Sequence, residues 1–338
     1  MKAWTLVRHG DPLTAFSLQE RTAPEPREGQ VLVQSEGFGL NYADVMAARG
    51  LYREAPPLPS VIGYEVVGRI VRTGSAVPEG LLGKRVAALT RFGGYAQLAV
   101  TDHRACTVVP DELPLGTALA LPTQGCTAWY AARILCPLRK GERVLVHSAA
   151  GGVGHLLVQL AANSGCEVIA IVSNKDKVAF AQRSGAQHVI DRSAGDIAGR
   201  LSQVLKGKKL DASFNAVGGS TFRTDLSMLG AGGRLVLFGG AERGSLAALG
   251  TLRFVWRMGI VVPIFLMMRS RSLLGVNMLH LADRRPDLIA ECMAGITEAQ
   301  RTGVVAPHVH DLFPAADLPK AISALASGHT IGKVCVRW

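Results

Sequence analysis

The stretch Arg143-Val144-Leu145-Val146-His147-Ser148-Ala149-Ala150-Gly151-Gly152-Val153-Gly154 decides the fold of this chain. Residues 143–147 are mostly apolar and predict a buried strand, and a helix is expected at 153–164. Aligned with the pattern G-x-G-x-x-G, Ala149 takes the first glycine position, and Gly151 and Gly154 take the other two. A glycine in the middle position lets the backbone approach a pyrophosphate, and the helix N-terminus offers oriented N–H groups. The stretch therefore predicts a dinucleotide-binding turn.

Short apolar strands alternate with helices around this turn. Strands are expected at 167–172, 188–190, 210–216 and 234–238, and helices at 127–135 and 175–184. Parallel strands joined by helices are buried on both faces, which explains why these strands are almost continuously apolar. The pattern predicts a doubly wound parallel sheet of the Rossmann type over residues 123–263.

Residues 1–122 have a different pattern from residues 123–263, because strands such as 30–35 and 84–89 are separated by glycine turns. This pattern indicates a β-rich domain ahead of the doubly wound one. The tail, residues 264–338, has mixed character, and we expect it to complete the first domain. A chain of 338 residues is long enough for two domains. The expected fold class is α/β, with one β-rich domain and one Rossmann domain.

The end of the second strand of the Rossmann pattern favours NADPH as the cofactor. NAD sites usually place Asp or Glu there to bind the ribose hydroxyls, but here Val172 is followed by Ser173. A 2′-phosphate would instead find the Ser173 hydroxyl as a donor and Lys177 and Arg192 as cations. Each of these basic residues could also be an ordinary surface charge. Taken together with the missing carboxylate, they predict NADPH.

The composition of the chain indicates which partners and which cellular compartment to expect. The net charge of +11 is dispersed along the chain, so nucleic acid is not expected as the primary partner, and an anionic cofactor also favours a basic cleft. The six cysteines include no CxxC pair, which favours free thiols in a reducing cytoplasm over a disulfide framework. The N-terminus runs directly into a strand pattern, and no signal peptide is recognised in it.

One apolar stretch, residues 254–268, is interrupted by Arg257 and Pro263. It is shorter than the roughly 20 apolar residues that a membrane-spanning helix needs. We therefore expect no transmembrane segment, and we expect this stretch to be buried or to face another subunit.

Several motifs resemble the medium-chain dehydrogenase/reductase superfamily, and within it the zinc-free quinone oxidoreductases. The matching segments run through the chain in the order of the family, at 40–44, 50–52, 63–68, 125–128, 149–154 and 332–334. The segment 41–52 is most similar to the branch that contains the vesicle amine transport protein. The resemblance implies a GroES-like catalytic domain, a Rossmann domain and a homodimer. It also implies cofactor contacts at Thr127, Ala149, Gly151, Gly152, Val153, Gly154, Asn215, Gly218, Phe238, Gly239, Asn277 and Lys333.

The chain departs from the zinc-dependent relatives at the positions of their metal ligands. Those relatives have Cys where this chain has Asn41, and His where it has Tyr64. Of the four cysteines of their structural loop, only Cys106 is present. Zinc sites need three soft or imidazole ligands, so we expect that no metal is bound.

Without a metal, the charge that develops on a reduced substrate needs hydrogen-bond donors and a proton source. The resemblance offers Asn41, Tyr52 and Tyr64 as donors and Asp44 as an orienting or relay group. We expect these side chains to line one cleft between the two domains, with Thr127 at the nicotinamide end of the cofactor. The tyrosines could instead be packing residues, and Asn41 with Asp44 could simply cap a helix.

These observations predict an oxidoreductase that transfers hydride from NADPH to a quinone or an α,β-unsaturated carbonyl compound. Two alternatives stay open at this point. The protein could reduce an enoyl thioester carried by CoA or an acyl carrier, or it could bind a dinucleotide without catalysis, because a fold does not fix a function.

Overall fold

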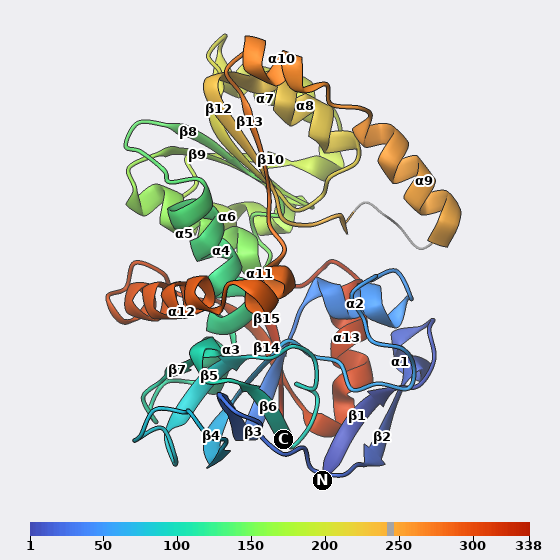
Figure 1. Ribbon diagram of the computed structural model, residues 1–338. Helices are drawn as coiled ribbons and strands as arrows, with labels where there is room; N and C mark the ends of the chain where they lie inside the picture. Colours follow the sequence, from blue (N-terminus) through green and yellow to red (C-terminus); the bar gives the residue numbers. More distant parts are fainter. Residues whose placement is uncertain (242–246) are drawn as a thin grey trace. The chain divides into compact units, whose positions relative to one another are not determined.

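Six parallel strands form the sheet of one of the two units into which the chain divides, Thr127–Asn277. The computed structural model describes residues 1–241 and 247–338 (Figure 1). The strand order is β10-β9-β8-β11-β12-β13. The strands are β8 (Arg143–Val146), β9 (Glu167–Val172), β10 (His188–Asp191), β11 (Leu210–Asn215), β12 (Leu229–Leu237) and β13 (Ser272–Gly275). The predicted doubly wound sheet is therefore confirmed.

Helices cover both faces of this sheet (Figure 1). The chain moves outward from β8 to β10 and then returns to β11 and β12 on the other side of β8. Because such crossovers are right-handed, α5 (Gly152–Asn163) and α6 (Val178–Arg183) lie on one face, and α7 (Ile197–Leu205) and α8 (Ser220–Met228) lie on the other. Buried side chains such as Leu145, Ile169 and Phe222 form a core of this unit.

The other unit comprises Met1–Cys126 and Met278–Trp338. Because it contains the N-terminus, we call it the first unit, and Thr127–Asn277 the second unit. Its main sheet has the order β14-β15-β3-β4-β5-β7, with β6 also paired to β3. The strands are β3 (Gln30–Leu40), β4 (Glu65–Thr73), β5 (Arg85–Leu89), β6 (Leu98–Asp102), β7 (Cys106–Val108), β14 (Val309–Pro314) and β15 (Lys333–Arg337). A two-stranded sheet of β1 (Lys2–Leu6) and β2 (Phe16–Glu20) adds to it. The C-terminal β15 pairs with β3, so residues 278–338 of the tail belong to this unit, whereas residues 264–277 do not.

The helices of this unit pack against its sheet and against one another. The side chains of α2 (Tyr42–Ala48) and α13 (Leu318–Ala326) contribute Val45, Ala47 and Ile322 to the main hydrophobic core. The remaining helices are α1 (Pro12–Ala15), α3 (Leu115–Leu119), α11 (Met278–Arg284) and α12 (Pro286–Arg301). After α3 the chain makes a π-helical turn at Leu121–Gly125, then α4 (Cys126–Trp129) and a second π-helical turn at Tyr130–Leu135.

The later border between the units differs from the expected one. The sequence pattern placed the end of the Rossmann domain at residue 263, whereas the compact unit extends to Asn277. The reason is β13, which pairs in parallel with β12 and extends the sheet by one strand. This strand is short and follows a long apolar segment, so its periodicity is weak in the sequence.

The apolar stretch at 254–268 is not buried within the chain. It lies in α9 (Ala247–Met258), in α10 (Pro263–Met268) and in the residues between them, and α10 has no buried side chain. The expectation of a buried segment is therefore wrong for the isolated chain, while the expectation that it faces another subunit stays a prediction. Among the described helices, none has the length and apolar character needed to cross a membrane.

Candidate cofactor and catalytic sites

The turn after β8 has the geometry that the glycine pattern predicts. Ser148 adopts a positive φ of 51°, and Gly151 caps the N-terminus of α5. A Cβ on Gly154 would collide with the carbonyl oxygen of Ser148 and would lie 2.9 Å from the Cα of Ala149. Gly154 is therefore required for the close packing of helix and strand.

Gly151 is explained differently. Its φ is −82°, which any residue can adopt, and an added Cβ would meet only the Ser148 carbonyl oxygen, at 3.2 Å. Within the chain itself, a side chain at position 151 would therefore require only a small shift of the Ser148 carbonyl group. A group that approaches the N-terminus of α5 from outside would benefit from the missing side chain, as a pyrophosphate does.

The three residues predicted to bind a 2′-phosphate come together at the ends of β9 and β10. Val172 pairs with Asp191, so Ser173 and Arg192 follow neighbouring positions of two parallel strands. Lys177 is 6% exposed, and its pKa is lowered by burial and by the nearby Arg192 guanidinium. The Ser173 hydroxyl is buried and has no hydrogen-bond partner in the described part of the chain. Two neighbouring cations and an unpaired hydroxyl form a site that suits a phosphate group.

Asn215 is placed at the same edge of the sheet, but its amide is used inside the protein. The side-chain oxygen accepts hydrogen bonds from the N–H groups of Val217 and Gly218, each at 2.8 Å. The amide nitrogen donates to Thr221 Oγ1 at 2.9 Å and to Asp225 Oδ2 at 2.6 Å. Asn215 therefore shapes the turn that ends in Gly218, rather than offering its own side chain to a ligand.

A buried contact between a histidine and an aspartate supports this turn. Asp225 Oδ2 lies 2.9 Å from His147 Nε2 and also accepts a hydrogen bond from Ser213 Oγ at 2.9 Å. His147 follows β8 and Ser213 lies in β11, so the pair ties two central strands to α8. None of the three was predicted as a site residue, because the sequence does not show which strands are neighbours.

The other predicted cofactor positions lie at strand ends or at the borders of the unit. Phe238 and Gly239 follow β12, and a Cβ on Gly239 would approach the Ala216 carbonyl oxygen to 2.6 Å. Thr127 and Asn277 are the first and last residues of the unit. The carboxyl ends of parallel strands are where open α/β sheets bind ligands, and most of the predicted set is found there.

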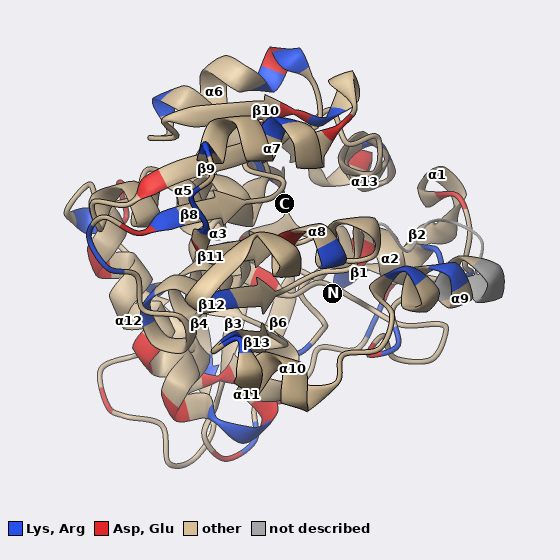
Figure 2. Cartoon of the chain, turned by 90° about the horizontal axis from the view of Figure 1, so that it is seen from above, with Lys and Arg blue, Asp and Glu red and all other residues tan. Residues whose placement is uncertain are grey.

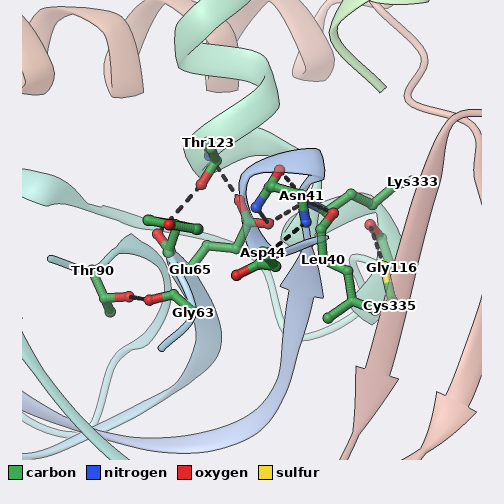
Figure 3. A network of polar contacts seen from close by, with 11 residues as sticks. Leu40, Asn41, Asp44, Gly63, Glu65, Thr90, Gly116, Thr123, Lys333 and Cys335 are labelled. Carbon is green, nitrogen blue, oxygen red and sulfur yellow. Dashed lines mark hydrogen bonds and ion pairs between the residues drawn. The ribbon is translucent and has the colours of Figure 1, made fainter. Parts of the chain in front are cut away.

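A cluster of buried polar side chains occupies the other unit (Figure 3). The Lys333 ammonium forms an ion pair with Glu65, and it donates hydrogen bonds to Asn41 Oδ1 at 3.1 Å and to the Leu40 carbonyl oxygen at 3.2 Å. Asn41 Nδ2 donates to Glu65 Oε1 at 2.8 Å. The Thr123 N–H donates to Glu65 Oε2 at 2.8 Å.

This cluster changes the interpretation of two predicted residues. Lys333 is fully buried and has three acceptors, so its ammonium stabilises the first unit instead of reaching out to a cofactor. Asn41 is 6% exposed, and both ends of its amide are engaged with Lys333 and Glu65. Glu65 itself was missed, although a carboxylate at the start of an apolar strand was a signal that could have found it.

Asp44 lies beside this cluster, in the first turn of α2. One of its carboxylate oxygens accepts a hydrogen bond from the Asn41 N–H at 2.7 Å, so the helix-capping interpretation is confirmed. Asp44 is fully buried, and burial raises its pKa to about 7, although the hydrogen bond from Asn41 opposes that shift. A carboxyl group that titrates near neutrality is suited to proton transfer.

The two predicted tyrosines are neighbours. The rings of Tyr52 and Tyr64 meet edge to face, with centroids 6.1 Å apart, and Phe92 packs on Tyr64 at 5.4 Å. Burial raises the pKa of Tyr52 to about 12 and raises that of Tyr64 still further. The Tyr64 hydroxyl is buried and has no partner of ordinary hydrogen-bond geometry in the described part of the chain. Both hydroxyls therefore stay protonated and can donate hydrogen bonds at neutral pH.

The donor set of the first unit does not fit a zinc ion. Within residues 1–241 and 247–338, no three His, Cys, Asp or Glu side chains are grouped as metal ligands. Glu65 is already paired with the Lys333 ammonium, and a metal cation placed there would be repelled by it. His308 and His310, which have metal-like spacing, are both exposed.

Known proteins share both units. Residues 27–111 match the model of the alcohol dehydrogenase GroES-like domain, and residues 152–294 match that of the zinc-binding dehydrogenases. A quinone oxidoreductase from Pseudomonas aeruginosa is 37% identical over 220 residues, which is 65% of this chain and 67% of the relative. The synaptic vesicle membrane protein VAT-1 homolog from Homo sapiens is 28% identical over 324 residues, which is 94% of this chain and 81% of the relative.

Solved structures agree with these matches. The quinone oxidoreductase from Thermus thermophilus, which has also been solved in complex with NADPH, superposes with a TM-score of 0.80 at 31% identity, over all of both chains. The chain is thus an oxidoreductase with a GroES-like unit and a Rossmann unit. It belongs to the medium-chain dehydrogenase/reductase superfamily, in the branch of the quinone oxidoreductases and VAT-1-like proteins.

Proposed function

We propose that this protein binds NADPH and transfers hydride from it to a quinone or an α,β-unsaturated carbonyl compound, without zinc. The observation that carries the proposal is the group of Ser173, Lys177 and Arg192, which combines an unpaired buried hydroxyl with two neighbouring cations. These residues would hold the 2′-phosphate, and the N-terminus of α5 with Gly151 would hold the pyrophosphate. When bound, NADPH supplies the hydride.

The residues of the first unit supply the groups that a metal supplies elsewhere. Tyr64 and Tyr52 offer hydroxyl donors for an oxygen that gains negative charge. Asp44, with a pKa of about 7, can hold or release a proton beside them. Lys333 and Glu65 neutralise each other and fix Asn41, so the cluster keeps its shape without an added cation.

Cofactor titration tests the proposal directly. By calorimetry, NADPH is expected to bind at least tenfold more tightly than NADH, a difference of roughly 1.4 kcal/mol. Lys177→Ala and Arg192→Ala should reduce this preference and leave NADH binding nearly unchanged. Arg183→Ala, which removes an exposed cation from α6, is the matched control. Equal affinities for the two cofactors in the wild-type protein would contradict the proposal.

The substrate class is tested by following NADPH oxidation with quinones, enones and enoyl-CoA thioesters in parallel. The proposal expects turnover with members of the first two groups. Turnover of the thioesters alone would make the protein an enoyl-thioester reductase. Oxidation with none of the three would leave a dinucleotide-binding protein without this activity.

We also propose a homodimer that works in the reducing cytoplasm. All six cysteines are unpaired, which suits such a compartment. Strand β13 ends the Rossmann sheet, and the free edge of a sheet can pair with the same strand of a second chain across a two-fold axis.

A further inference from the structure

The second unit carries an apolar surface that the rest of the described chain leaves uncovered. It is formed by α9, α10 and the segment between them, and we call it the α9–α10 surface. Trp256 is 77% exposed, Ile260 is 94% exposed and Met268 is 72% exposed. Leu252, Val255 and Phe265 are also more than half exposed. A patch of this extent on a folded domain usually marks an interaction site.

The fold itself does not need these side chains. Helix α9 is attached through its other side, where the Phe254 ring lies against Gly218 and Gly240 and Met258 packs on the core. Leu252, Val255 and Trp256 follow the spacing i, i+3, i+4, which places them on one face of the helix. That face points into solvent, so its apolar character requires another explanation.

The charge of the α9–α10 surface indicates what kind of partner it binds. From residue 243 to residue 282 the chain contains five arginines and neither Asp nor Glu. In Figure 2, α9 carries basic but no acidic positions, and α10 carries neither kind. Arg253 and Arg269 are exposed, and the Arg269 guanidinium lies 6.0 Å from the centre of the Phe265 ring. Arg271 donates to the carbonyl oxygens of Leu226 and Leu229, so Arg253 and Arg269 are the cations shown exposed beside the apolar side chains. The partner must therefore accept both apolar side chains and positive charge.

An anionic lipid surface meets both requirements. A second copy of this chain, which the sequence alone suggests for residues 254–268, meets them poorly, because a two-fold contact pairs a surface with itself and would bring the arginines of one copy near those of the other. Interfacial helices typically combine Trp, Phe and Leu on one face with arginines, and anionic lipids attract such segments. Helix α9 has 12 residues and α10 has 6, so both suit a position in the headgroup layer.

We propose that the α9–α10 surface binds anionic phospholipid membranes, with Trp256 and Ile260 inserted among the acyl chains and the arginines at the phosphate groups. The test uses the full-length protein with vesicles of phosphatidylcholine, with or without one quarter phosphatidylglycerol. Co-sedimentation should show binding to the anionic vesicles that is at least tenfold stronger than to the neutral ones, and 0.5 M salt should weaken it. Tryptophan emission should shift to shorter wavelength on binding, and Trp256→Phe should remove most of that shift.

Two double variants separate the contribution of the apolar side chains to vesicle binding from that of the arginines. Trp256→Gln with Ile260→Gln should reduce vesicle binding at least tenfold, and Arg253→Gln with Arg269→Gln should reduce it by roughly tenfold on anionic vesicles only. Leu82→Gln, which removes a side chain 62% exposed on the other unit, is the control and should bind as the wild type does. NADPH oxidation in the absence of vesicles verifies that each variant is folded.

Three outcomes would overturn the proposal. The wild-type protein could fail to bind anionic vesicles. The control could lose as much binding as the α9 variants. The Trp256→Gln, Ile260→Gln variant could change the oligomeric state in light scattering, which would make this surface a contact between copies of the chain.

Discussion

The ammonium group of Lys333 forms an ion pair with the carboxylate of Glu65, and neither side chain has any exposed surface. The two residues are far apart in the chain and meet because β15 pairs with β3, with Val334 opposite Leu40. A Cβ on Gly39 would collide with both side chains, so this glycine provides the space for the pair.

Removing one partner of this pair should be costly. Lys333→Met leaves Glu65 buried without its counter-ion, and breaking a buried pair typically costs about 3–5 kcal/mol. Denaturant unfolding of the variant should show a loss of that order. The control is Arg72→Met, which breaks a pair with Glu25 in which both side chains are at least half exposed and should cost at most about 1 kcal/mol. Equal losses in both variants would show that the buried pair contributes no more to the free energy of unfolding than the exposed pair does. Lys333→Met combined with Glu65→Gln should recover part of the stability.

Asp44 should make stability depend on pH. Its pKa is about 7 in the folded protein and 3.8 in the unfolded chain, so the folded state holds the proton more tightly. The resulting stabilisation is complete below pH 4 and is lost as the pH rises through 7, by up to about 4 kcal/mol. Asp44→Asn should make the free energy of unfolding depend less on pH over this range, whereas Asp176→Asn, at an exposed position, should not. Unfolding free energies measured from pH 4 to 8 check this, and parallel profiles for wild type and Asp44→Asn would contradict it.

The tyrosine hydroxyls should matter more for enones than for quinones. An enolate must also be protonated at carbon, whereas a reduced quinone takes its protons readily at oxygen. Loss of one positioned donor typically lowers turnover by about 10²–10³-fold. We expect Tyr64→Phe and Tyr52→Phe to approach this loss with an enone and to lose less with a quinone. Tyr42→Phe, at a side chain 38% exposed in α2, is the control. If neither variant loses more than about threefold with either substrate, the tyrosines are packing residues.

Activity should not require a metal ion. Asn41 and Tyr64 stand where zinc-dependent relatives have ligands, and the Lys333 ammonium already pairs with Glu65. NADPH oxidation should therefore be unchanged after prolonged chelation, and elemental analysis should find far less than one zinc per chain. A stoichiometric metal that is lost together with the activity would refute this expectation.

Two chains should associate through β13. Light scattering at micromolar concentration should give the mass of two chains. Leu274→Lys places a charge on the edge strand and should shift the equilibrium toward single chains, because charged edges oppose pairing. The exposed Leu82→Gln change should have no such effect. A single-chain mass for the wild type would exclude this assembly under those conditions.

The sequence by itself determined the Rossmann turn and the composition of its cofactor edge. Strand, glycines and helix follow one another from Arg143 to Gly154, so the pattern is local and its physical requirements can be read in order. Ser173 and Arg192 could be found for a related reason, since each directly follows a strand, and parallel strands bring their carboxyl ends to one edge.

The tertiary structure alone decided which polar groups face one another. Nothing near Lys333 in the chain reveals that Glu65 and Asn41 lie beside it, because sheet pairing joins residues that are far apart in sequence. Exposure of the α9–α10 surface was likewise hidden in the sequence. Apolar residues give the same periodicity on a buried face and on an uncovered one, and only the packing of Phe254 and Met258 decides which side of α9 is inside.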